Sequence, residues 1–325
     1  MKLLRRRFLC LTIGAVALPA VSQIAKAQAF PTRPVRLIVP VAAGGPADVL
    51  ARLYAQKLTH RWNQPVVVEN RAGATGTIGT EVVVKAPPDG YTLLFTVDLP
   101  ITMAPVLLKP RYDSQRDLIP IAAVAISENL LVVTASTGIR SLADLVAAAK
   151  ARPDSLTFAS AGIASPAHLC VEMLKQQAGI EMTHVPFPGA APALNAVLSG
   201  AVNMFCGPIP LEMSHVKSGK LNALGVTGAA PSRLAPGVPS ISASYPGLVI
   251  SNWFALFAPA GTPANVTNFL RDELDAVYRD TELQEKLAIM GLDPVWKSSA
   301  ELTDAIKKDA TKWMEFTKAT KIKAE

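Results

Sequence analysis

Cysteine and histidine are scarce in this sequence, and the few that occur form no recognisable site. The 325 residues include 3 cysteines and 4 histidines, and no Cys-x-x-Cys pair occurs. The histidines are His60, His168, His184 and His215. Their separations do not match the spacing of metal ligands, so we expect no bound metal.

Motifs for catalysis and for cofactors are also missing. Ser165 does not stand in a G-x-S-x-G elbow, because Ala167 occupies the place of the second glycine. The stretch GATGTIG at 73–79 has the wrong glycine spacing for a dinucleotide fold and lacks the acidic residue about 20 positions later. We therefore expect no cofactor and no catalytic residue.

The chain carries no basic stripe that could follow a phosphate backbone. The formal net charge is +7, but five uncompensated positive charges lie in the first 26 residues. They are Lys2, Arg5, Arg6, Arg7 and Lys26. The remainder is near +2, so we expect no binding to nucleic acid.

The N-terminus has the organisation of a secretory signal peptide: a basic start, an apolar middle and a small-residue end. The apolar run at 8–20 is too short to span a bilayer. Cleavage after an Ala-x-Ala site would remove residues 1–27, or 1–29. Arg5-Arg6-Arg7-Phe8-Leu9 also resembles a twin-arginine signal. Cys10 lacks the preceding small residue of a lipoprotein signal, so we expect a soluble, exported protein without lipid.

Export would leave Cys170 and Cys206 as the last thiols of the chain in an oxidising compartment. One pair is not a disulfide framework. Two alternatives stay open, a single disulfide or two buried free thiols.

The length and the hydrophobic pattern predict two α/β domains. About 298 residues remain after cleavage, which is typical of two domains. Strand patterns at 35–40, 65–70 and 91–97 alternate with helical patterns at 46–58 and 79–87. The alternation restarts at 129–135 and continues to 221–227, and after 252–263 only helices are expected. This order predicts mostly parallel sheets covered by helices.

One corner occurs twice along the chain. VPVAAGGPADVL at 39–50 and FASAGIASPAHL at 158–169 each run from a strand, through small residues, into a helix that begins with Pro-Ala. Ligands bind at such strand ends in open α/β sheets. Helix N-termini present free N–H groups and a partial positive charge. Each corner alone is also ordinary α/β construction, but the pair predicts one anion held between two domains.

An ordered set of motifs resembles the Bug-type receptors of tripartite tricarboxylate transporters, from about Phe30 to at least Trp296. The set comprises PVRLIVP at 34–40, GGPAD at 44–48, VVVENRAGATGTIG at 66–79, PDGYTLL at 88–94, SAGIASPAHL at 160–169, HVPFPGAAPAL at 184–194 and, after Trp253, APAGTP at 258–263. The resemblance implies a two-lobed type II periplasmic binding protein whose lobes are joined by crossover strands. Lobe 1 is expected at 28–128 and 252–325, and lobe 2 at 129–251.

Two departures from the family concern the far half of the expected pocket. Phe187-Pro188 stand where the family usually has Tyr-Lys, and Asn203 stands where Asp is common. Phe187 is expected either to form a cleft wall for an apolar or aromatic ligand or to pack in the core.

Several polar residues near the corners have two interpretations. Asp48 is expected to accept the N–H groups of its own helix. If it faces the cleft instead, it would favour an ammonium group. His168 is expected to be neutral at a helix N-terminus, bonded within its lobe or to ligand. Thr75, Thr77, Thr96 and Asp98 either contact ligand or satisfy local backbone.

The resemblance and the corners together predict a monomeric receptor that binds a small carboxylate and delivers it to membrane transporter subunits. The ligand is a di- or tricarboxylate, an amino acid or an aromatic acid. A periplasmic enzyme and an input protein for a sensor kinase are the alternatives. The candidate ligand-binding residues are Val41, Ala42, Ala43, Gly44, Gly45, Asp48, Thr75, Thr96, Asp98, Ser160, Ala161, Gly162, Ile163, Ala164, Ser165, His168, Phe187 and Asn203.

Overall fold

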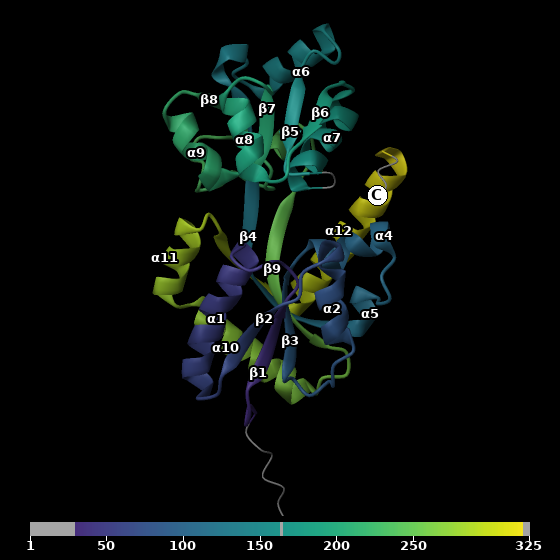
Figure 1. The fold of residues 1–325 in the computed structure, drawn as a ribbon, viewed down its shortest axis with the longest axis vertical. Helices are drawn as coiled ribbons and strands as arrows, with labels where there is room; N and C mark the ends of the chain where they lie inside the picture. Colours follow the sequence, from purple (N-terminus) through teal and green to yellow (C-terminus); the bar gives the residue numbers. More distant parts are fainter. Residues whose placement is uncertain (1–29, 163–164, 321–325) are drawn as a thin grey trace, which may run out of the picture.

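Two lobes, one above the other in Figure 1, are joined by long strands in a computed structural model that describes residues 30–162 and 165–320. The expected signal peptide therefore lies outside the described residues. The strands are β1 (Val35–Val39), β2 (Val66–Asn70), β3 (Thr92–Val97), β4 (Leu118–Thr134), β5 (Thr157–Ser160), β6 (Thr183–Pro186), β7 (Met204–Pro208), β8 (Leu221–Val226), β9 (Ser251–Pro259) and β10 (Asp293–Ser298). The helices are α1 (Pro46–Trp62), α2 (Thr77–Val84), α3 (Leu99–Thr102), α4 (Ala104–Leu108), α5 (Ser114–Asp117), α6 (Leu142–Ala151), α7 (Pro166–Ala178), α8 (Ala190–Leu198), α9 (Ile209–Lys217), α10 (Ala264–Tyr278), α11 (Thr281–Ile289) and α12 (Ser299–Thr320).

The lower lobe is built around β1, which lies between β2 and β3 and is parallel to both. Its side chains alternate between the two faces of the sheet. Leu37 and Val39 pack in a cluster with Leu50 of α1. Ile38 packs on the other face with Val83 of α2. Both faces of this apolar strand are therefore buried, as is usual in a parallel sheet covered by helices.

The upper lobe repeats this plan with β5 between β6 and β7, again all parallel. Strands β7 and β8 each pair antiparallel with β4. The β4 residues Leu130, Leu131, Val132 and Val133 are all fully buried. They form the centre of a core that α7, α8 and α9 cover (Figure 1).

The lobes are connected by β4 and β9, which run from one to the other (Figure 1). They pair antiparallel from Leu118↔Pro259 to Glu128↔Ser251. The mixed α/β, two-lobed fold expected from the sequence is confirmed. We propose to keep the division at 128/129 and 251/252, because the buried clusters on either side of it are largely separate.

Three of the differences from the sequence prediction concern β4, β10 and α9. Strand β4 extends back to Leu118, whereas only 129–135 was predicted. Strand β10 and helix α9 were not predicted. Each of these segments lacks a clear period: β10 is intermediate in exposure throughout, and α9 follows β7 directly with Pro210 in its first turn. None of the helices in the described residues combines the length and the apolar character that a membrane span requires.

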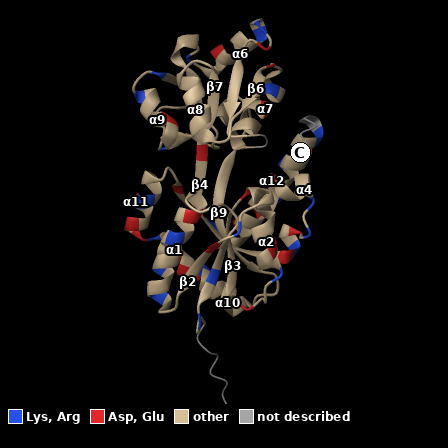
Figure 2. Cartoon of the chain, in the orientation of Figure 1, with Lys and Arg blue, Asp and Glu red and all other residues tan. Residues whose placement is uncertain are grey.

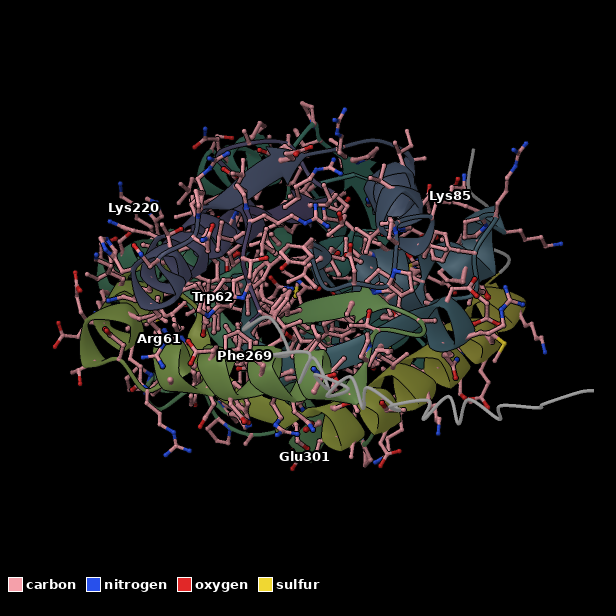
Figure 3. The ribbon with its side chains drawn as sticks, turned by 90° about the horizontal axis from the view of Figure 1, so that it is seen from below. Arg61, Trp62, Lys85, Lys220, Phe269 and Glu301 are labelled. Carbon is pink, nitrogen blue, oxygen red and sulfur yellow. The ribbon has the colours of Figure 1, made fainter. Side chains whose placement is uncertain are left out.

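The end of α1 is fixed to α10 at the base of the lower lobe (Figure 3). Arg61 Nε donates to Glu273 Oε2 at 2.8 Å, and Trp62 Nε1 donates to the same oxygen at 3.0 Å. The Trp62 and Phe269 ring centroids are 5.8 Å apart. This contact brings a residue of the first helix against one more than 200 positions later, so the C-terminal segment completes the lower lobe.

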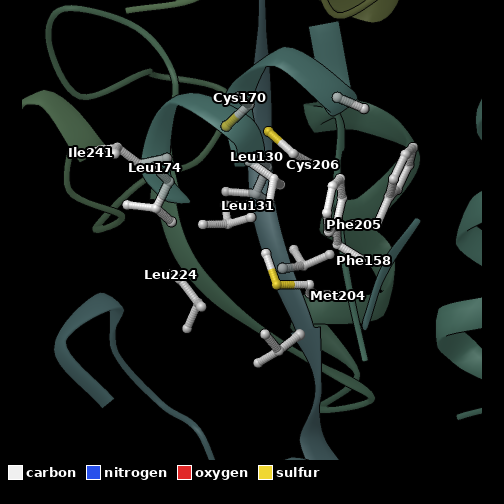
Figure 4. Close-up of a cluster of buried hydrophobic side chains, with 14 of the residues drawn as sticks. Leu130, Leu131, Phe158, Cys170, Leu174, Met204, Phe205, Cys206, Leu224 and Ile241 are labelled. Carbon is white, nitrogen blue, oxygen red and sulfur yellow. The ribbon is translucent and has the colours of Figure 1, made fainter. Parts of the chain in front are cut away.

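Cys170 and Cys206 are both buried and free, which answers the alternative left open by the sequence. Their sulfur atoms approach each other in the upper-lobe core (Figure 4). Burial, followed by a hydrogen bond with Cys170, raises the pKa of the Cys206 thiol well above its usual range. The Cys206 side chain is therefore a neutral thiol at neutral pH.

Helix α12 extends from the lower lobe to the upper one. Its residues Trp313 and Phe316 are 3% and 5% exposed and belong to the buried cluster of the upper lobe. Lys312 Nζ donates to the Val249 carbonyl oxygen at 3.1 Å. The helix therefore stabilises the position of one lobe against the other.

Trp313→Ala should lower the free energy of unfolding by about 3 to 5 kcal/mol, because it removes a buried indole and leaves a cavity. The neighbouring Met314, 44% exposed, is the matched control, and Met314→Ala should change the value by less than about 0.5 kcal/mol. Urea unfolding followed by circular dichroism measures both. Equal effects of the two substitutions would contradict the packing of α12 against the upper lobe.

Candidate functional site

A cavity of about 470 Å³ lies between the two lobes, with walls from both of them and a floor from the crossover strands. Its size is typical of a site for a small molecule. The lining residues are Val41, Ala42, Ala43, Gly45, Pro46, Ala47, Val97, Leu99, Ser127, Asn129, Ala161, Ser165, Pro166, Ala167, Ala190, Phe205, Cys206, Pro208, Asn252 and Phe254. A larger hollow of about 810 Å³ between α7 and α12 is away from the strand ends.

The lower wall is the loop between β1 and α1. Gly44 has φ +86°, a left-handed conformation that glycine adopts without strain. Gly45 is the N-cap residue, in extended conformation and without a side chain, and Pro46 is the first helical residue. Because Gly45, Pro46 and Ala47 all line the cavity, the first turn of α1 faces it. That end of the helix carries free N–H groups and a partial positive charge.

Asp48 forms hydrogen bonds within the lower loop and with its neighbours, and it does not line the cavity. Its carboxylate accepts hydrogen bonds from Gly44 N at 2.9 Å, Asn70 Nδ2 at 2.9 Å and Arg52 Nε at 3.0 Å. Burial raises the pKa of this carboxyl, but the bonds from Arg52, Gly44 and Asn70 outweigh it, so the net shift is downward. Asp48 therefore stabilises the loop as an anion paired with Arg52, and it accepts an N–H just before its helix rather than within it.

The upper wall is the loop between β5 and α7. Ser165 is the N-cap residue, and its Oγ accepts from His168 N at 3.4 Å. Ser160 Oγ accepts from Gly162 N at 3.1 Å and lies 2.7 Å from His184 Nε2. Ala161 and Ser165 line the cavity, whereas Ser160 and Gly162 shape the loop from behind. The candidate residues Ile163 and Ala164 lie outside the described residues.

The His168 ring lies behind this wall in a stack of rings. Its centroid is 4.1 Å from that of His184 and 6.1 Å from that of Phe158. Burial first, and then the charge of Lys175, lowers the pKa of His168 to about 4. Burial and His168 lower that of His184 to about 4, against the opposing charge of Glu172. Both imidazoles are neutral at pH 7, as expected for His168.

The other candidate residues do not line the cavity. Asn203 Oδ1 accepts from Thr157 N at 2.8 Å, and Thr96 Oγ1 donates to the Val97 carbonyl at 3.1 Å. Phe187 packs against the upper-lobe core. Gly44 supports the lower loop from outside, and Thr75 lies before α2 with φ +53°.

Asp98 lies one residue beyond β3, with its carboxyl fully buried. One of its oxygens has no hydrogen-bond partner among the described residues. Burial and then the charge of Asp309 raise its pKa to about 7. It does not line the cavity, so the structure offers no contact between this carboxyl and a bound ligand.

The floor of the cavity was missed by the sequence interpretation. It includes Ser127 and Asn129 of β4 and Asn252 and Phe254 of β9. A signal for these residues was present, because Asn129 and Asn252 stand directly at the two predicted lobe boundaries. Strands that cross between lobes must pass under a cleft, so polar residues at the crossing points are candidates for ligand contact.

The arrangement brings two helix N-termini to one cavity and surrounds them with small side chains. Over the described residues, no group of three or more His, Cys, Asp or Glu side chains could hold a metal ion. Charged residues of both signs alternate over the outer helices of both lobes (Figure 2). The geometry therefore fits an organic anion held by backbone dipoles.

Comparisons with known proteins match the chain to a family of transporter receptors. The family model described as "Tripartite tricarboxylate transporter family receptor" matches residues 50–322. BugT of Bordetella pertussis is 32% identical, covering 94% of each chain. Rpa4515 of R. palustris, solved with adipate, is 31% identical with a TM-score of 0.75, covering 90% of this chain and 99% of its own. MatC of Rhodopseudomonas palustris, solved with bound malate, is 28% identical with a TM-score of 0.71, covering 88% and 99%.

The stacked histidines make the upper lobe sensitive to acid. Their pKa values are about 4 in the folded protein against 6.5 for ordinary histidine. The unfolded chain therefore binds more protons between these values, and stability present above pH 6.5 is lost as the pH falls toward 4. The substitution His168→Phe keeps a ring in the stack but removes the group that binds the proton. At pH 5 the variant should therefore regain on the order of 1 to 2 kcal/mol of the free energy of unfolding that the wild type loses.

Thermal unfolding of both proteins between pH 7 and pH 5 measures this effect. The acidic groups are common to the two proteins, so the difference between their pH profiles isolates His168. Parallel profiles would contradict a depressed pKa at this position.

Proposed function

The chain belongs to the tripartite tricarboxylate transporter receptor family, and from this premise we propose that it binds a small carboxylate between its lobes and delivers it to the membrane subunits of such a transporter. The family is one of receptors, so the chain is a receptor and not an enzyme. We further propose that it acts as a monomer in the periplasm, after removal of the N-terminal signal peptide.

One observation carries the proposal: the first turns of α1 and α7 line the same cavity from opposite lobes. Each helix end carries a partial positive charge, although in α7 the Ser165 hydroxyl already accepts one first-turn N–H, that of His168. A carboxylate between them contacts both lobes at once, which favours a closed arrangement over an open one. Binding of this kind couples the presence of the ligand to the shape of the receptor.

The choice of a carboxylate is supported by two relatives of similar fold. Rpa4515 was solved with adipate and MatC with malate. Both ligands carry carboxylates, although their carbon skeletons differ. We propose that Val41, Ala42, Ala43, Gly45, Ala161 and Ser165 contact the ligand, because these six candidate residues line the cavity.

A carboxylate ligand should raise the Tm of the purified protein. A ligand at about 100 times its Kd adds roughly 2.7 kcal/mol to the stability of the native state. Differential scanning fluorimetry with adipate, malate, citrate, hexanoate and benzoate tests this expectation. The matched diamides of adipate and malate are the controls and should give no shift. A panel without any shift, or with turnover of one acid, would refute the receptor proposal.

Filling either wall of the cavity should weaken binding. Ala43→Phe in the lower loop and Ala161→Phe in the upper one each place a large side chain where a small one lines the cavity. Each should raise the Kd at least about tenfold, since the ligand must lose contact with one helix end. Val49 on α1 is 37% exposed and does not line the cavity, so Val49→Phe is the control. Isothermal titration with the acid that gives the largest Tm shift measures all three. Normal binding by a folded Ala161→Phe variant would show that the upper loop is not part of the site.

A further inference from the structure

The cavity offers very little charge to its ligand. Within the described part of the chain, none of the 20 lining residues is Asp, Glu, Lys, Arg or His. Asp48 and His168 lie just behind the walls, but the first is paired with Arg52 and the second is neutral at pH 7. The helix ends are therefore the main attraction for an anion.

That attraction is confined to one part of the cavity. Pro46 and Ala47 begin α1, of 17 residues, and Pro166 and Ala167 begin α7, of 13 residues. All four line the cavity, so the two helix ends share it. The effect of a helix end falls off within its first turn. One carboxylate can be held in this place.

The remaining walls are mostly hydrocarbon. They include Val97 and Leu99 from the lower lobe, Phe205 and Pro208 from the upper lobe, and Phe254 from the floor. An ionised carboxylate pressed against such walls loses its hydration without gaining a cation, and the polar residues of the floor, Ser127, Asn129 and Asn252, are all neutral. A second carboxylate on the ligand is therefore strongly disfavoured here, whereas an apolar carbon skeleton is favoured.

Asn129 is one of three polar residues of the floor, with Ser127 and Asn252. Asn129 is one of the lining residues, it is only 6% exposed, and its buried Nδ2 has no hydrogen-bond partner among the described residues. Its backbone is fixed, because Asn129 N donates to Thr227 Oγ1 at 3.0 Å and Thr227 N donates to Asn129 O at 2.9 Å. A buried donor without an acceptor is costly. A ligand that carries an acceptor at this point would satisfy it.

We propose that the ligand is a monocarboxylate with an apolar body that carries one neutral hydrogen-bond acceptor, such as a ketone oxygen, for Asn129 Nδ2. This inference rests on the proposed receptor function and narrows it. The carboxylate lies between the starts of α1 and α7, the body contacts Leu99, Phe205 and Phe254, and the acceptor reaches the floor.

Matched acids separate this inference from the function on which it rests. Hexanoate and adipate share a six-carbon chain and differ by the second carboxylate, and benzoate and terephthalate form an aromatic pair. Isothermal titration of the mature protein should show the monoacid of at least one pair binding at least about tenfold more tightly than its diacid. A diacid that binds as tightly as its monoacid, or binding of malate or citrate alone, overturns the inference but leaves the receptor function intact. Absence of binding by every acid overturns both.

The role of Asn129 is tested with a second matched pair, 5-oxohexanoate and hexanoate, which differ by one ketone oxygen. The wild type should prefer the oxo acid by about 2- to 12-fold, the range that one net hydrogen bond provides. Asn129→Leu keeps the side-chain shape without the donor and should abolish this preference. Asn129→Ala is a second variant in case Leu disturbs the strand, and circular dichroism confirms the fold of each. Because the two acids are compared within each variant, a general loss of stability cancels. A preference that persists without Asn129, or that is absent from the wild type, overturns its assignment as the donor.

Discussion

The antiparallel pairing of β4 with β9 is the interaction on which the rest of the structure depends. These strands pair from Leu118↔Pro259 to Glu128↔Ser251, and β4 then continues as the partner of β7 and β8. On the other side, β9 pairs with β3, and through β3 with β1. Both parallel sets of strands are thus attached to one ladder. The ladder therefore sets where the carboxyl ends of β1 and β5 lie, and with them the two helix N-termini that line the cavity.

The two corners follow the same backbone path, but they differ in the charge of the side chain at the third helical position. In the lower one, Gly45 caps α1 without a side chain, and Asp48 is turned back to Gly44 and Arg52. In the upper one, the Ser165 hydroxyl accepts an N–H of α7, and a neutral imidazole occupies the position of Asp48. Neither corner directs a full charge at the cavity. An anion is therefore recognised by the fixed dipoles of the backbone and not by charged side chains. This limits the site to groups that fit the geometry of those dipoles.

Much of the fold was predictable from sequence because it depends on local pattern. The apolar run at β1, the small-residue loop and the Pro46 start of α1 all agree with the structure. The upper-lobe strand β5 and helix α7 agree as well. What failed depended on tertiary context. The segment LIPIAAVAISENLLVVT has no period of two, since β4 is buried on both faces for most of its length, so its first half gave no strand pattern.

The direction of side chains explains why some of the candidate residues do not line the cavity. A loop sequence indicates which backbone approaches the cavity, and the lining residues at 41–43, 45, 161 and 165 follow from it. Polar side chains at strand ends, such as Thr96 and Asn203, can point to either face, because one residue of register reverses them. Instead, the side chains of Thr96 and Asn203 form hydrogen bonds with the backbone nearby. Asn129 shows the reverse case: its backbone is bonded to Thr227 across the sheet, whereas its side-chain Nδ2 has no partner among the described residues. A buried donor that local structure does not use is a stronger indication of a ligand contact than a polar residue type at a strand end.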